Sequence, residues 1–247
     1  MRIDHTAYIM EYLGFYYGPK ELLADLDEAG IQKAIVMPGF SLDPDLESHA
    51  RTLEPYKDRL MGAAWINPHA QMAVEKLERA VKRHGFCELK IMPTSHYVPL
   101  FTELTHPLMR KAEELRIPVT IHTGTYNCVP LELIPLAERF PRVPIIMEHM
   151  GYRHFEPDEG VLQAIEVAKR CDNVYLDTSH VFNPRLLAYA VKKVGAERII
   201  FGSEAPMRPP KLCLEILRIA DLRKREEELI LGENLEGLLR GNMGSPS

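Results

Sequence analysis

The sequence predicts an α/β fold, a (β/α)8 barrel, and three observations lead to this prediction. Short apolar segments of strand length recur along the whole chain, and each precedes a longer amphipathic segment with a period near 3.6 residues. Eight such units follow one another without a linker, in a chain of 247 residues that is typical of one barrel. The strand segments are nearly continuously apolar, as parallel strands are when helices cover them.

The eight predicted strands cover residues 2–9, 33–37, 60–66, 86–92, 118–121, 144–147, 173–176 and 198–201. Helices are predicted between them at residues 20–29, 70–83, 107–115, 131–140, 160–170, 184–194 and 211–220. Segment 70–83 illustrates the helical pattern, because its charged residues lie opposite one apolar face. That face consists of Met72, Ala73, Leu77, Ala80 and Val81.

Two C-terminal helices, at residues 223–231 and 234–239, are expected to pack on the outside of the barrel. The last residues, 241–247, are small and polar and should be disordered, so we expect a single barrel domain over residues 1–240. A doubly wound sheet is the alternative. It usually has fewer strands and a glycine-rich first turn, whereas the first strand here contains His5-Thr6-Ala7.

Composition excludes several classes of function. The net charge is −5, and the densest basic run, at residues 223–225, is followed directly by three glutamates, which argues against nucleic-acid binding. No apolar segment approaches the 18 residues of a membrane-spanning helix, so we expect no membrane partner. Residues 1–8 lack the apolar core of a signal peptide. The four cysteines form no CxxC pair and are expected to be reduced thiols in a cytoplasmic protein.

Five predicted strands carry chemically versatile side chains, four of them beyond the apolar segment and one, His5, within the first strand. Each has an ordinary structural explanation when it is considered alone, such as a hydrogen-bonded histidine. The carboxyl ends of barrel strands meet at one mouth, however, and active sites lie there. Their shared position predicts one active site, and imidazoles with a carboxylate suit Zn²⁺, Mn²⁺ or Fe²⁺. The residues are His5, His122, His149, His180 and Glu204.

These motifs resemble the amidohydrolase superfamily, in particular the branch that contains aminocarboxymuconate semialdehyde decarboxylase and related hydrolases. The resemblance covers nearly the whole chain, with its motifs in the same order. The matching stretches are Ile3-Asp4-His5 and residues 85–93 (GFCELKIMP), 117–124 (IPVTIHTG), 145–151 (IIMEHMG), 173–179 (NVYLDTS), 198–206 (RIIFGSEAP) and 230–239 (ILGENLEGLL).

The resemblance implies a divalent metal held by an HxH pair on strand one, the strand-five histidine and a strand-eight aspartate. Carried over by position, His5 and His122 match ligands, and His149 matches the acid/base histidine. The chain departs from the pattern in two places, because Ala7 replaces the second histidine of HxH and Glu204 replaces the aspartate. An alternative register, which aligns Thr6 and Tyr8 with HxH, fits worse. His5, His122 and Glu204 would still form a three-ligand set with open positions.

Lys90 lies within the fourth predicted strand, where binuclear relatives carry a bridging carbamylated lysine. One strand-one histidine leaves too few ligands for a second metal. We therefore expect Lys90 to be a substrate or structural partner.

The function predicted first is metal-dependent hydrolysis of an amide, ester or lactone in a small substrate. His149 would contact the attacking water or the oxyanion, and Glu204 or His180 would transfer the proton. Non-oxidative decarboxylation of an unsaturated or aromatic acid would use the same residues. A third hypothesis, motivated by Ala7, is a barrel that has lost metal and catalysis and only binds a small molecule.

Substrate contacts are predicted just beyond the strand ends. Arg153 and Arg208 could hold a substrate carboxylate, and Tyr126, with Tyr12 and Tyr152, could line the pocket. Loop packing explains the tyrosines equally well. A homodimer is implied by the resemblance only.

Overall fold

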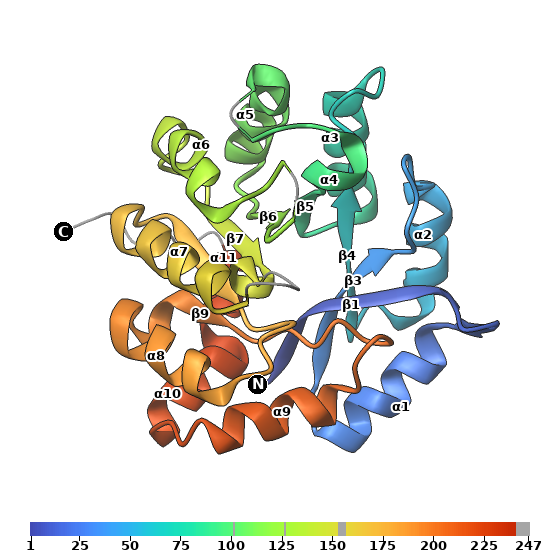
Figure 1. Cartoon of the computed structure of the whole chain (residues 1–247). Helices are drawn as coiled ribbons and strands as arrows, with labels where there is room; N and C mark the ends of the chain where they lie inside the picture. The colour runs from blue at the N-terminus through green and yellow to red at the C-terminus, as the bar shows by residue number, and fades with distance from the viewer. Residues whose placement is uncertain (101, 126, 153–156, 241–247) are drawn as a thin grey trace.

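The predicted strands all occur in the computed structural model, and they curve into one sheet surrounded by helices (Figure 1). The structure describes residues 1–100, 102–125, 127–152 and 157–240, so the predicted disordered tail at 241–247 lies outside the described residues. The strands are β1 (Ile3–Tyr12), β2 (Phe15–Tyr17), β3 (Lys33–Pro38), β4 (Leu60–Trp65), β5 (Glu88–Ile91), β6 (Val119–His122), β7 (Ile145–Glu148), β8 (Val174–Asp177) and β9 (Ile199–Ile200).

The sheet closes into a barrel through its first and last strands. Its order is β2-β1-β3-β4-β5-β6-β7-β8-β9, and every pair except β1–β2 is parallel. The amide of His5 donates to the Phe201 carbonyl over 2.9 Å, and the amide of Tyr8 donates to the Ala205 carbonyl over 2.8 Å. These bonds join β1 to the segment that follows β9, which confirms the predicted barrel.

Strand β2 was not predicted. It forms a hairpin with the extended end of β1 around Leu13-Gly14, and both turn residues have positive φ values (48° and 85°). This is the conformation that two-residue hairpin turns require, and glycine adopts it without strain. A glycine between Tyr12 and the aromatic run that begins at Phe15 was the sequence signal for this turn.

The helices cover the outside of the barrel, and α1 packs beside α9 where the ring closes (Figure 1). They are α1 (Pro19–Ala29), α2 (Leu46–Leu53), α3 (Ala73–His84), α4 (Pro93–His96), α5 (His106–Leu115), α6 (Ile134–Arg139), α7 (Pro157–Arg170), α8 (Pro184–Val194), α9 (Pro210–Ile219), α10 (Lys224–Glu228) and α11 (Asn234–Leu239). The predicted helix at 131–140 divides into a 3-10 turn (Pro130–Leu133) and α6. Pro135 lies in the first turn of α6, where a helix does not need the N–H group that proline lacks. Helix α2 was not predicted, although the side chain of Asp45 caps it by accepting from the amide of Ser48.

The barrel interior is apolar at one end and polar at the other. The apolar end contains Ile3, Ile35, Ala63, Ile146 and Ile200, and Leu235 and Leu238 of α11 pack against them. Because side chains alternate along a strand, the next inward position on β7 after Ile146 is Glu148. The C-terminal helix thus lies against the apolar end, and the polar side chains occupy the end where the strands terminate.

Asn173 fixes the connection into β8. Its side-chain amide donates to the carbonyls of Ala137, Phe140 and Val143 over 3.0–3.2 Å. We expect Asn173→Ala to lower the free energy of unfolding by about 1–3 kcal/mol, since it leaves buried carbonyls without donors. Urea unfolding measures this loss. Gln71→Ala, at an exposed position, should change it by less than about 0.5 kcal/mol, and an equal effect of both changes would contradict the assignment.

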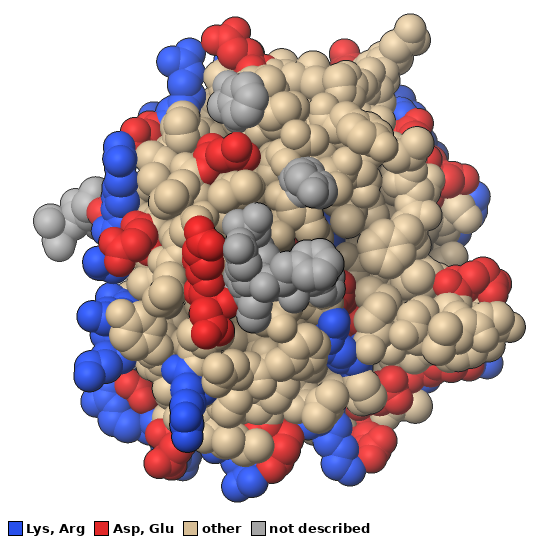
Figure 2. Space-filling model, viewed as in Figure 1, with Lys and Arg blue, Asp and Glu red and all other residues tan. Residues whose placement is uncertain are grey.

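Two expectations about the environment of the chain can be compared with the structure. No helix within the described ranges is long and apolar enough to cross a membrane. The four cysteines are free, as predicted. On the face shown in Figure 2, acidic and basic side chains intermingle around the rim of helices.

Candidate active site at the barrel mouth

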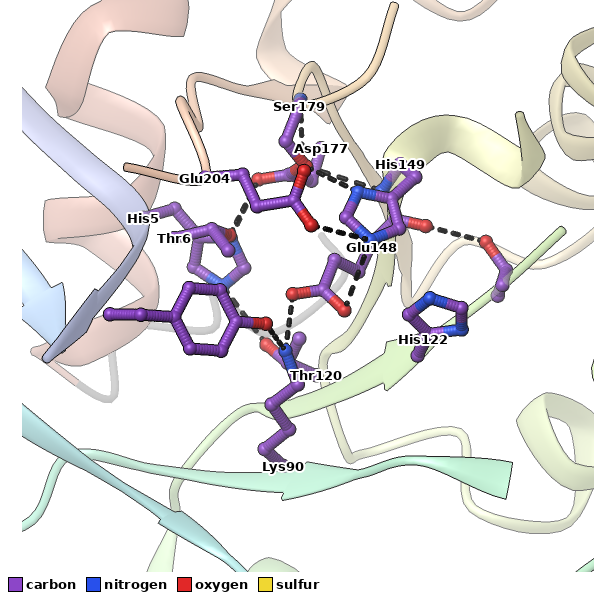
Figure 3. A network of polar contacts seen from close by, with 12 residues as sticks. His5, Thr6, Lys90, Thr120, His122, Glu148, His149, Asp177, Ser179 and Glu204 are labelled. Atoms are coloured by element: carbon purple, nitrogen blue, oxygen red, sulfur yellow. Dashed lines mark hydrogen bonds and ion pairs between the residues drawn. The ribbon is translucent and has the colours of Figure 1, made fainter. Parts of the chain in front are cut away.

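The candidate site lies at the carboxyl ends of β6, β7, β8 and β9 (Figure 3). Gly124 lets the ends of β6 and β7 approach each other, because a Cβ there would lie 2.1 Å from the carbonyl oxygen of Tyr152. Thr123 links the same two ends, since its hydroxyl donates to the Glu148 carbonyl over 2.6 Å and accepts from the Gly151 amide over 3.0 Å. This packing brings the ring of His122 to 4.9 Å from that of His149, measured between centroids.

His149 lies at the centre of the site and is buried. Its Nδ1 is 2.8 Å from the hydroxyl oxygen of Ser179, and that hydroxyl donates to Asp177 Oδ1. Because the serine proton is committed to the carboxylate, the serine oxygen accepts from His149 Nδ1–H. The Nε2 atom of His149 therefore carries a lone pair. Burial, reinforced by the nearby His122 and His180, holds the pKa of His149 well below its usual range, so the imidazole is neutral.

Two carboxylates face the lone pair of His149. Glu148 Oε2 lies 3.5 Å from His149 Nε2, and Glu204 Oε1 lies 3.8 Å from it. Oxygen Oε2 of Glu148 is buried and has no hydrogen-bond partner in the described part of the chain. Two groups of three side chains could each hold a metal ion, because their nitrogen and oxygen atoms lie within 4.8 Å of one another. The first group is His122, Glu148 and His149, and the second is His149, His180 and Glu204.

Glu204 is held by two basic side chains. Its Oε2 lies 2.7 Å from His180 Nε2 and also contacts Nη1 of Arg208. Burial and the neighbouring Glu148 raise the pKa of Glu204 to about 7, against the opposing effect of Arg208. A carboxyl group with this pKa can both accept and release a proton near neutrality.

Lys90 points into the barrel beneath these groups and is completely buried. Its Nζ forms an ion pair with Glu148 Oε1 and lies 2.6 Å from the hydroxyl of Tyr8. It also lies over the rings of Tyr8 and Trp65, 4.9 and 5.4 Å from their centroids. Lys90 thus neutralises one side of Glu148 and leaves Oε2 of that residue facing His149.

The surroundings of His5 bear on its role as a metal ligand, which stays a prediction. Neither three-residue group includes it among the described residues, and both of its ring nitrogens are already engaged. Nδ1 lies 2.8 Å from Asp177 Oδ2, and Nε2 lies 3.2 Å from Glu88 Oε2 and 2.9 Å from Thr120 Oγ1. Glu88 is the inward-facing residue of β5 that comes before Lys90, so it lies further from the mouth than Lys90 does. Because His5 contacts Glu88, it lies at this deeper level of the barrel interior.

A local irregularity in β1 changes which residues follow His5 on the inward face. The pairing of β1 with β3 shifts register between Asp4 and Ala7. As a result Thr6 also reaches Asp177, with its hydroxyl 3.2 Å from Oδ2, and Tyr8 reaches Lys90. Periodicity alone could not reveal this shift.

The structure brings together five of the residues singled out in the sequence, His122, His149, His180, Glu204 and Arg208. Tyr126 and Arg153 lie outside the described residues. Tyr152 packs near His180, with ring centroids 6.0 Å apart, whereas Tyr12 lies in the hairpin against Phe15.

Five further candidate residues were not predicted, namely Glu88, Thr120, Glu148, Asp177 and Ser179. A signal was present, because charged residues interrupt strand segments that are otherwise apolar, as Glu88 and Lys90 do in β5. A buried charge is costly unless it is paired, so such interruptions mark the inward face of a polar site.

The backbone at the strand ends is strained. His149, His180 and Glu204 have φ values of 65°, 65° and 68°, in the left-handed region that non-glycine residues avoid at a cost of about 1–2 kcal/mol. Strain of this kind is concentrated at functional sites, where the surrounding structure enforces it.

A closed barrel of parallel strands, with buried carboxylates, a lysine and histidines where the strands end, is typical of (β/α)8-barrel enzymes. The amidohydrolase family profile matches residues 11–242, and the chain belongs to this family. The match begins beyond His5 and Tyr8, the segment in which the strand-one motif departs from the pattern.

Solved structures with the same fold include hydrolases and decarboxylases. An uncharacterized TIM-barrel protein from Bordetella bronchiseptica is 20% identical (TM-score 0.81; 97% of this chain and 98% of that chain covered). A probable 2-pyrone-4,6-dicarboxylic acid hydrolase from Acinetobacter baumannii, with citric acid bound, is 16% identical (TM-score 0.80; 97% of this chain and 99% of that chain covered). A dihydroxybenzoic acid decarboxylase from Polaromonas, with manganese and 2-nitroresorcinol bound, is 17% identical (TM-score 0.75; 98% of this chain and 98% of that chain covered). No curated protein matches the chain by sequence.

Proposed function

We propose that this amidohydrolase-family chain hydrolyses an amide, ester or lactone bond of a small carboxylated substrate with the help of one divalent metal ion. The observation that supports the proposal is the lone pair of His149 Nε2, which faces Glu148 Oε2 and Glu204 Oε1 at 3.5 and 3.8 Å. Three electron-rich atoms directed at one point repel one another unless a cation or a proton lies between them.

The residues present fit a metal ion. His122, Glu148 and His149 offer two imidazoles and a carboxylate, which suit Zn²⁺ or Mn²⁺. The buried Glu148 Oε2 lacks a hydrogen-bond partner among the described residues, as an unused ligand atom would. Bound there, a divalent ion would act as a Lewis acid that polarises a substrate carbonyl and lowers the pKa of water.

The remaining side chains supply proton transfer and orientation. Glu204 is the general base, since its pKa of about 7 lets it take a proton from the attacking water. His180, 2.7 Å from Glu204 Oε2, can pass the proton to the leaving group. Arg208 fixes Glu204 from the solvent side and is placed to attract a substrate carboxylate. The substrate contacts of Tyr126 and Arg153 stay predictions.

Non-oxidative decarboxylation is the second candidate, and the pKa of Glu204 favours it too. A carboxyl group that is half protonated near pH 7 can deliver a proton to a ring carbon as carbon dioxide leaves. Assays on lactones, esters, amides and unsaturated or aromatic acids separate the two reactions, because only the second releases carbon dioxide.

Elemental analysis tests the metal. We expect about one divalent ion per chain, and saturating metal at about 100 times its Kd should raise the free energy of unfolding by about 2.7 kcal/mol. Glu148→Gln and His122→Ala should lose the ion, whereas His69→Ala, at an exposed histidine, should keep it. A protein without metal and without turnover on the whole panel would support the third hypothesis, a barrel that only binds a small molecule.

Two further proposals concern the surroundings of the enzyme. The four free cysteines support a cytoplasmic location. A homodimer stays a prediction from the family resemblance.

A further inference from the structure

We propose that a buried relay, Glu88–His5–Asp177–Ser179, is a positioning device that locks His149 in one tautomer, with the proton on Nδ1 and the lone pair on Nε2. Figure 3 shows its part from His5 through Asp177 and Ser179 to His149. The proposal rests on the proposed function, which gives the Nε2 lone pair its role. It assigns to His5 a task different from the metal binding that the sequence predicts.

The relay begins with an imidazolium enclosed by two carboxylates. His5 Nδ1 lies 2.8 Å from Asp177 Oδ2, and Nε2 lies 3.2 Å from Glu88 Oε2, with all three side chains fully buried. Both ring nitrogens face acceptors, so both carry protons. The doubly protonated ring thus gives Asp177 a positively charged donor at 2.8 Å.

Asp177 divides its two oxygens between two sets of donors. Oδ2 faces His5 and the hydroxyl of Thr6, at 2.8 and 3.2 Å. Oδ1 accepts from the amide of Ser179 at 2.8 Å, from its hydroxyl, and from the amide of His149 at 3.4 Å. Since donors already surround both oxygens of Asp177, the Ser179 hydroxyl donates to Oδ1 as well.

The tautomer of His149 follows from that constraint. Ser179 Oγ can only accept from His149 Nδ1 over their 2.8 Å contact, because its own proton is used. A protonated Nε2 would leave Nδ1 and Ser179 Oγ as two facing acceptors in a buried site, which is unfavourable. The relay therefore directs the lone pair of Nε2 at Glu148 and Glu204, where the proposed metal site and base lie.

A purely structural role for these contacts is the competing explanation, and the matched pair Ser179 and Ser203 distinguishes the two. Both are buried serines whose hydroxyls donate to a buried carboxylate, Asp177 and Asp4 respectively. Of these two serine–aspartate pairs, only Ser179–Asp177 contacts a ring nitrogen of His149. Loss of either hydroxyl should destabilise the fold to a similar degree, but only Ser179→Ala should change His149.

The test is nitrogen NMR of the histidine side chains in the full-length protein after metal removal, with the His149 signals assigned through His149→Gln. Affinity for Mn²⁺ alone, measured by calorimetry, is the second readout. We expect the Nδ1–H tautomer in the parent protein. Ser179→Ala should populate the Nε2–H form and weaken Mn²⁺ binding by about 10–100-fold, the range for loss of an orienting partner. Ser179→Thr, which keeps a hydroxyl, should restore both, and Ser203→Ala should alter neither.

His5→Gln tests the distal part of the relay. It should shift the tautomer in the same direction as Ser179→Ala, since Asp177 loses its charged partner. An Nε2–H tautomer in the parent protein, or an unchanged tautomer in both Ser179→Ala and His5→Gln, would overturn the proposal. Hydrolysis is not needed for either readout. A locked tautomer without turnover therefore refutes only the proposed function, and normal turnover with an unlocked tautomer refutes only the relay.

Discussion

Replacing His149 with asparagine or glutamine is expected to lower kcat by about 10²–10⁴-fold, which is the range for loss of a positioned acid/base group. The two variants remove different halves of the ring. Asparagine can keep the donor to Ser179 Oγ but lacks Nε2, whereas glutamine reaches toward the Nε2 position and leaves Ser179 without its donor. Since the proposed chemistry uses Nε2, both variants should lose activity. Steady-state kinetics on the substrate found in the panel measures the effect.

His49 provides the control for this prediction. It is also buried, but it lies in α2 and its Nε2 contacts the Val36 carbonyl at 3.0 Å, away from the mouth. His49→Gln should reduce stability and leave kcat within about twofold. An active His149→Asn variant, or equal loss of activity in His49→Gln, would remove His149 from the mechanism.

Replacing Lys90 with methionine is expected to lower the free energy of unfolding by about 3–5 kcal/mol, the usual cost of removing one partner of a buried ion pair. Both Lys90 and Glu148 are fully buried. Methionine fills much of the lysine volume but leaves the carboxylate of Glu148 in the barrel without its counter-charge. Urea denaturation gives the loss directly.

A second substitution shows whether the uncompensated charge is the cause. The double variant Lys90→Met with Glu148→Leu should recover most of the lost stability, because it removes both charges together. Lys82→Met breaks the exposed pair with Glu78, whose side chains are 65% and 37% accessible, and should cost less than about 1 kcal/mol. If Lys90→Met is as mild as Lys82→Met, the interior pair does not stabilise the fold as described.

Much of the candidate site could be predicted because the chain positions it by repetition. His122, His149 and Glu204 each follow an apolar strand segment, and parallel strands in a barrel end at one rim. Such a pattern needs no knowledge of distances. The role of His5 could not be predicted in this way, because it depends on which side chains of β5, β6 and β8 meet its two ring nitrogens.

The sequence by itself determined the barrel, the order of its strands and the rim at which the histidines gather, since alternation of apolar strands and amphipathic helices depends only on local periodicity. Only the tertiary structure decided which atoms meet. Glu148 turns one oxygen to Lys90 and the other toward His149, and Asp177 joins His5 to Ser179. These contacts connect residues up to 172 positions apart. Hydrogen bonds and ion pairs depend on distances of a few ångströms, and these are fixed only when the barrel closes.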